Sequence, residues 1–120
     1  KATLRLDPDW EEMLRREEAG IFCVWAARVG KTLAGFISFH LMPHLNYRST
    51  LFAMDAGHFL SPEFRDKGRL GFRMWRTVEP ALWARGCRIV WAHDNARHSL
   101  MPFFLALDYE PRGTFFLKEL

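Results

Sequence analysis

The stretch that most constrains this chain is the basic, glycine-spaced turn "SPEFRDKGRLGFRMW" at residues 61–75. It follows an apolar run at 51–60 that predicts a strand, and it begins a segment that predicts a helix. Arg65, Lys67 and Arg69 stand at the predicted helix start, where the helix dipole disfavours each cation by ~0.3–1 kcal/mol. A bound phosphate would reverse this, because free backbone N–H groups and the dipole attract anions. The turn therefore predicts an anion site, with a solvated basic turn as the alternative.

The helix that follows the turn is expected from about Leu70 to Arg85. Its apolar side chains recur at every fourth position: Leu70, Met74, Val78 and Leu82. Pro80 should kink the helix or mark its weak end, and Gly86 should end it. A short buried strand is expected at 87–92. The unit 51–92 has the length of a right-handed parallel crossover, and ligands bind such sheets at the carboxyl end of the first strand.

The N-terminal part predicts one helix and then a hairpin. In "LDPDWEEMLRREEAG" (6–20), Asp7 reads as the N-cap, Pro8 as the first helical residue and Gly20 as the stop. The expected buried stripe of this helix is Trp10, Met13 and Leu14. Strands are expected at 21–28 and 32–41, joined through Val29-Gly30-Lys31.

The remaining segments complete a mixed sheet. A loop is expected at 42–50, and Gly57 in the strand 51–60 suggests a bulge or a close backbone approach. Ser99 is expected to cap a helix that runs to about Leu107, and a turn and a last strand should follow. The fold class is α/β (α+β): a mostly antiparallel sheet with a parallel strand pair in its middle and flanking helices. We expect one domain over 1–120.

Composition narrows the classes of protein. The chain has 120 residues, 49% of them hydrophobic and 26% charged, which is typical of a globular domain. No apolar run approaches a membrane span, and the start shows no signal-peptide pattern. Cys23 and Cys87 lie in apolar surroundings without a CxxC motif, which predicts reduced thiols and a cytoplasmic location. The net charge of +3 favours an anionic ligand without requiring nucleic acid.

At the basic turn the chain resembles the GNAT superfamily of N-acetyltransferases. The segment "FLSPEFRDKG" (59–68) is similar to that family's cofactor loop and the strand before it. The matching positions are Leu60, Pro62, Glu63, Arg65 and Gly68. Leu70 departs from the usual Gly or Ala, and Gly71 follows it. "KGRLG" (67–71), "PHLNY" (43–47) and "DYEPRGTFFLKEL" (108–120) look nearer to small phage- and prophage-type members.

The resemblance implies a GNAT fold with a central, splayed parallel strand pair, and acetyl transfer from acetyl-CoA to a primary amine. It implies that the strand and helix with which family members usually begin are missing before this segment. The implied CoA-binding residues are Phe59, Leu60, Arg65, Asp66, Lys67, Gly68, Arg69, Leu70, Gly71 and Phe72. The diphosphate would lie on the turn, and the thioester near Phe59 and Leu60, where a backbone N–H would stabilise the oxyanion.

The resemblance identifies the catalytic side chains less directly than the CoA-binding residues. The tyrosine that many family members use as an acid falls on Phe104, which cannot donate a proton, and Tyr109 matches a structural aromatic. On the strand 51–60, His58 is the expected base and Asp55 the alternative. Strand alternation places these two on opposite faces unless Gly57 carries a bulge. A structural histidine and a salt-bridged aspartate remain the alternatives.

Other signals are weaker. "VGKT" (29–32) lacks the earlier glycine of a phosphate-binding P-loop. The histidines expected at the surface or at the rim of a substrate site are His40, His44, His93 and His98, and their context argues against metal binding. The arginines near 65–76 leave a nucleic-acid-binding module as a remote alternative. The other alternative function is a protein that binds CoA but does not catalyse transfer. An exposed Trp83 or Phe72 would allow a homodimer.

Overall fold

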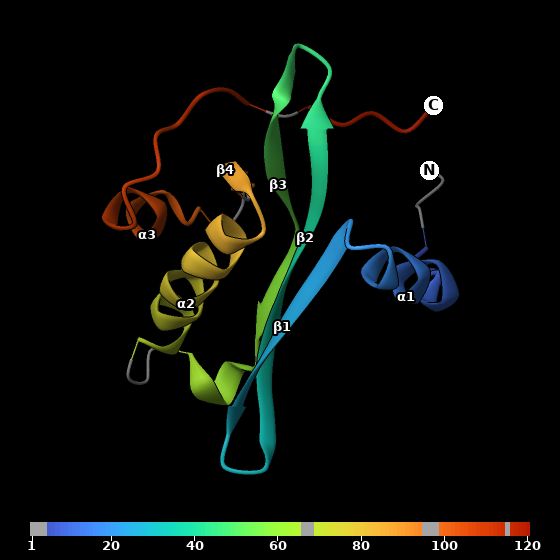
Figure 1. Cartoon of the computed structure of the whole chain (residues 1–120). Coiled ribbons are helices and arrows are strands. Elements are labelled where there is room, and N and C mark those ends of the chain that lie inside the picture. Colours follow the sequence, from blue (N-terminus) through green and yellow to red (C-terminus); the bar gives the residue numbers. More distant parts are fainter. Residues whose placement is uncertain (1–4, 66–68, 95–98, 115) are drawn as a thin grey trace.

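The sheet of this protein has the strand order β1-β2-β3-β4. The computed structural model describes residues 5–65, 69–94, 99–114 and 116–120. The elements are α1 (Trp10–Glu18), β1 (Phe22–Val29), β2 (Thr32–His44), β3 (Tyr47–Leu60), a 3-10 turn (Pro62–Phe64), α2 (Leu70–Ala84), β4 (Cys87–Trp91) and α3 (Met101–Ala106). β1–β2 and β2–β3 pair antiparallel, and β3–β4 pair parallel. The predicted mixed sheet with one parallel pair and flanking helices is confirmed (Figure 1), and in the described strand order the pair stands at the β4 end of the sheet, not in its middle.

Two-residue turns join the antiparallel strands. Val29 pairs with Thr32, and Gly30 between them has a φ of 61°, which confirms the predicted hairpin. The loop predicted at 42–50 is wrong, because β2 and β3 continue until His44 pairs with Tyr47. Aromatic contacts extend the strands there, since the His44 ring lies 5.1 Å from Tyr47 and 5.0 Å from Phe52. Pro43, which suggested a break, is tolerated beside a register shift.

The core lies between the sheet and α2, which together with α3 occupies one side of the sheet in Figure 1. Trp75, Val78 and Leu82 of α2 are buried, and the Trp75 ring meets Phe39 of β2 edge-on at 5.5 Å. Leu70 and Met74, the other members of the predicted stripe, are partly buried. Pro80 stands inside α2, and Gly86 follows the helix end with a φ of 97°.

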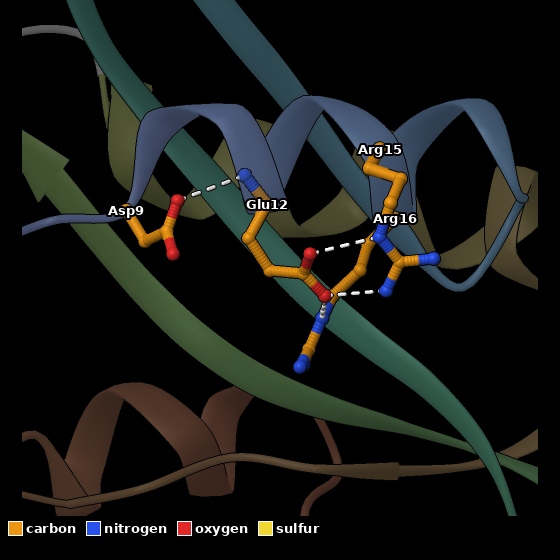
Figure 2. A network of polar contacts seen from close by, with 4 residues as sticks. All are labelled: Asp9, Glu12, Arg15 and Arg16. Atoms are coloured by element: carbon orange, nitrogen blue, oxygen red, sulfur yellow. Dashed lines mark hydrogen bonds and ion pairs between the residues drawn. The ribbon is translucent and has the colours of Figure 1, made fainter.

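The first helix differs from its prediction. It begins after Asp9, whose carboxylate accepts the N–H of Glu12, so neither Asp7 nor Pro8 starts it. Arg15 and Arg16 both donate to Glu12, as Figure 2 shows, and these hydrogen bonds lower the pKa of Glu12 to about 2. The expected stripe is not buried: Trp10 is 67% and Leu14 60% exposed. Local capping and ion pairs therefore hold α1 more than packing does.

The C-terminal part also differs. The helix α3 begins after Leu100, and Ser99 is not its N-cap, although the Ser99 hydroxyl accepts the N–H of Met101. The last strand predicted within 109–120 is wrong for the described residues of that stretch, which form neither helix nor strand. Phe116 and Leu117 are 93% and 84% exposed, so they lack the sheet contacts that would stabilise a strand.

We predict that Phe39→Ala destabilises the protein by ~3–5 kcal/mol, because it removes a fully buried ring between Trp25 and Trp75. Urea unfolding measures this change. Phe36→Ala, three residues earlier on the same strand, is the control. That side chain is 39% exposed, so its loss should be clearly smaller, and equal losses would contradict the assigned core.

Candidate active site

The two parallel strands pair over only part of their length. Register runs from Leu51 opposite Cys87 to Met54 opposite Trp91, and β4 ends there while β3 continues to Leu60. The Ser61 N–H donates to the Ala34 carbonyl of β2 at 2.8 Å. Because successive residues of a strand direct their backbone groups to opposite edges, the N–H and C=O of Leu60 point away from β2. The N–H and C=O of Leu60 therefore face the edge of β3 along which β4 no longer runs.

The end of β3 is held closely on both sides. A Cβ placed on Gly35 of β2 would lie 2.2 Å from the Phe59 carbonyl oxygen, so only glycine permits this approach. On the other side, the Nε of Arg65 donates to the Leu60 carbonyl at 2.7 Å. The same guanidinium lies 5.7 Å from the centre of the Phe59 ring. Arg65 thus contacts the strand end at which the resemblance to GNAT acetyltransferases implies that the thioester lies.

The start of α2 has backbone N–H groups that precede its first helical hydrogen bond. Arg69, the N-cap, has a left-handed backbone (φ 56°) and makes no side-chain capping bond. The first helical bond runs from the Arg73 N–H to the Arg69 carbonyl, so the preceding N–H groups of Leu70, Gly71 and Phe72 lie before it. Within the described part of α2, the first turn carries no acidic residue. This chemistry fits a diphosphate.

The strand end and the helix start are neighbours. A Cβ on Gly71 would lie 3.9 Å from a methyl carbon of Leu60, an ordinary contact distance. The Arg69 guanidinium stands 4.3 Å from the centre of the Phe72 ring. Asp66, Lys67 and Gly68, the other predicted ligands of this turn, lie outside the described residues. The structure therefore brings Leu60, Arg65 and residues 69–72 into one region.

A β-bulge brings His58 and Asp55 to the same face. Ser38 pairs with Gly57 and the next residue, Phe39, pairs with Asp55, so Ala56 is the extra residue of β3. The bulge suggested by Gly57 is thus present, one residue earlier. The His58 ring lies 5.8 Å from Trp75 and 6.4 Å from Phe104, on the side of α2 and α3. The Nδ1 of His58 lies 3.8 Å from Oδ2 of Asp55.

A second histidine meets the same carboxylate. Asp55 is 7% exposed, and its Oδ2 accepts the backbone N–H of His93 at 3.1 Å. The Nδ1 of His93 also lies 3.8 Å from this oxygen. Sequence reasoning placed His93 at the surface or a substrate rim and did not connect it with Asp55. The available signal was the parallel pair, because residues that follow β4 must lie beside residues that follow its last partner, Met54.

Aromatic side chains of α2, α3 and the segment after α3 pack near His58. Phe104 is 6% exposed and meets Trp75 edge-on. The Tyr109 ring lies 5.8 Å from Trp75, and its Oη is buried without a hydrogen-bond partner among the described residues. Burial, with smaller contributions from the charges of Glu79 and Asp55, raises the pKa of Tyr109 well above its ordinary value. The phenol therefore stays protonated.

The remaining signals lie elsewhere. Gly30 and Lys31 form the hairpin turn, and His40 and His44 contact Phe22 and Phe52 at other places on the sheet. In the described ranges, no group of three or more His, Cys, Asp or Glu side chains is arranged to hold a metal ion. None of the helices described there is long and apolar enough to cross a membrane.

Comparison with known proteins gives the family. The model of the "Acetyltransferase (GNAT) family" matches residues 2–109. The chain belongs to the GNAT acetyltransferase family. Members are typically acetyl-CoA-dependent N-acetyltransferases. A search of curated proteins found no match.

Solved structures show the same GNAT fold. A transcriptional regulator from Bacillus halodurans C-125 has a TM-score of 0.80 at 14% identity, covering 92% of this chain and 73% of its own. Glucosamine-6-phosphate N-acetyltransferase from Arabidopsis thaliana has a TM-score of 0.76 at 13% identity, with the same coverage of 92% and 73%. AAC(6')-Iy, in complex with the bisubstrate analogue CoA-S-monomethyl-acetylneamine, has a TM-score of 0.69 at 21% identity, covering 92% and 76%.

We predict that Asp55→Ala destabilises the protein by ~1–3 kcal/mol, because the His93 N–H loses its acceptor beside a buried core. Asp55→Asn keeps an oxygen at the same place, so urea unfolding should show a smaller loss for it. Equal losses in the two variants would show that the hydrogen bond to His93 does not hold the segment after β4.

Proposed function

We propose that this protein transfers an acetyl group from acetyl-CoA to a primary amine. Family membership supports the reaction class. The observation that carries the proposal is the start of α2, whose N-cap Arg69 makes no side-chain capping bond, beside Leu60 at the end of β3. An anionic ligand bound at that helix start would lie next to a strand end whose N–H and C=O point outward.

Different residues of the chain would bind the diphosphate and the thioester of acetyl-CoA. Backbone N–H groups of Leu70, Gly71 and Phe72, with Arg69, would hold the diphosphate. The same proposed CoA-binding turn also includes Arg65, Asp66, Lys67 and Gly68. Phe59 and Leu60 would position the thioester, and the Leu60 N–H would donate to the oxyanion that forms on the acetyl carbonyl. Acetyl-CoA supplies the activated acetyl group.

The proposed base is His58. An ammonium must lose a proton before its nitrogen can attack, and the His58 side chain is 30% exposed while that of Asp55 is 5% exposed. Asp55 already accepts a hydrogen bond from His93. We therefore assign proton removal to His58, with the Asp55 carboxylate near its ring, and much of the acceleration to the alignment of two reactants.

A CoA-binding protein without turnover is the second candidate. The buried Phe104 favours it, because this ring stands where many family members carry a proton-donating tyrosine. We also propose a cytoplasmic location, which the buried, unpaired thiols of Cys23 and Cys87 support. A homodimer and a phage-type origin stay predictions. Trp83 is 62% exposed, with the Arg88 guanidinium 3.6 Å from the centre of its ring.

We predict that Arg69→Glu weakens CoA binding by about tenfold or more, equivalent to ~1.4 kcal/mol, because it reverses a charge at the proposed diphosphate site. The fold should persist, since a carboxylate suits a helix start. Isothermal calorimetry with CoA measures the change. Arg48→Glu, the same exchange at the exposed start of β3, should leave affinity unchanged. Equal weakening in both would indicate a diffuse charge effect.

We expect the wild-type protein to release thiol from acetyl-CoA when it is mixed with a primary-amine acceptor. The measurement is thiol release with spermidine, an aminoglycoside, a lysine-containing peptide and a peptide with a free N-terminus. CoA binding with no release for any of these would favour the second candidate. Absence of CoA binding would contradict both, and DNA binding with a steep salt dependence would favour a nucleic-acid module.

A further inference from the structure

Two imidazoles from different strands meet one buried carboxylate in this protein. His58 projects from β3 after the bulge, and His93 follows β4, yet the Nδ1 of each lies 3.8 Å from the same Oδ2 of Asp55. Both side chains are partly exposed, at 30% and 39%, while that of Asp55 is 5% exposed. In each ring Nε2 is the nitrogen farther from the carboxylate. The Asp55 carboxylate therefore has two titratable rings near it, beside the place where β3 and β4 separate.

The segment that carries His93 is anchored on both sides. Its own N–H donates to Asp55, and the next residue, Asp94, accepts the Leu100 N–H at 2.6 Å and the Ser99 hydroxyl at 2.8 Å. These bonds join the end of β4 to the start of α3. Because the bond to Asp55 uses the backbone, it holds the segment whatever side chain stands at 93. The imidazole is thus not needed for that anchor.

Acetyl transfer to an amine needs a proton taken and a proton given. Phe104 cannot give one, and His58 is assigned to take one. We propose that His93 is a second catalytic imidazole, which protonates the departing sulfur, with the Asp55 carboxylate close to both rings. This inference rests on the proposed function and names a further residue for it.

The proton and bond changes balance. His58 takes a proton from the substrate ammonium, and the freed nitrogen forms a bond to the acetyl carbon. The C–S bond then breaks as the sulfur takes a proton from the imidazolium of His93, which gives the thiol. The new amide nitrogen loses its second proton to solvent, and solvent restores the protonation of both rings. One proton is released in each turnover.

Tyr109 is the rival proton donor. Its Oη is buried without a partner among the described residues, and it stays protonated. However, its ring is partly buried and packs against the core, with Trp75 and Phe104 as neighbours. The Tyr109 hydroxyl is buried, whereas the His93 side chain is 39% exposed and lies where the paired strands end. We therefore assign the role to His93 and use Tyr109→Phe as a discriminating variant.

Labelling with bromoacetyl-CoA tests the placement without a known acceptor. An imidazole nitrogen attacks the CH₂ carbon, the C–N bond forms and bromide leaves. We expect mass spectrometry to find the label on His58 or His93 in the wild type, and on His93 in His58→Gln. Excess CoA should block it, and His40 should stay unmodified. If His58→Gln binds CoA normally but shows no label on His93, the proposal is overturned while the proposed function survives.

Kinetics test the role. With the amine that gives the most thiol release, His93→Gln should lower kcat on the order of 10²-fold with little change in the KM for acetyl-CoA. Added imidazole should restore part of the rate to His93→Ala, which a structural role would not allow. His40→Gln and Tyr109→Phe should keep most of the wild-type kcat. An unchanged kcat in His93→Gln, or a large loss confined to Tyr109→Phe, overturns the assignment. Absence of CoA binding by the wild type overturns the proposed function as well.

Discussion

One extra residue in β3 decides which side chains meet beside the core of this protein. Without the bulge at Ala56, alternation would send Asp55 and His58 to opposite faces of the sheet. With it, both face α2 and α3, where Asp55 also reaches the backbone of His93. Bulges next to active sites commonly redirect a side chain in this way. The grouping of two imidazoles around one carboxylate depends on that local irregularity.

The second element of the site comes from topology. A parallel pair needs a crossover, and here the crossover helix begins beside the end of the longer strand. The N–H groups that open α2 and the outward backbone of Leu60 are therefore adjacent. Neither feature requires an unusual side chain. The strand pairing leaves room for this, because the register stops at Met54 and Trp91 while β3 continues to Leu60.

Much of this arrangement was predictable from the sequence, and the failures have physical causes. Periodic apolar residues located α2, and the turn residue Gly30 located the first hairpin. Pro43 and Asn46 suggested a loop, but aromatic packing around His44 extended the strands. Trp10 and Leu14 have helical spacing, yet the structure leaves them exposed, because spacing does not show whether a partner surface exists. His93 was missed because its relation to Asp55 spans two strands and has no local pattern.

The hydrogen bond from Arg65 to the Leu60 carbonyl has a consequence for any molecule that extends the sheet at this edge. Such a molecule would meet an acceptor already satisfied by a charged donor. Its association there would be an exchange of one hydrogen bond for another, with a small net enthalpy. Selectivity at this edge would then come from how well the hydrogen-bonding groups of the bound molecule match the direction and spacing of those of the strand.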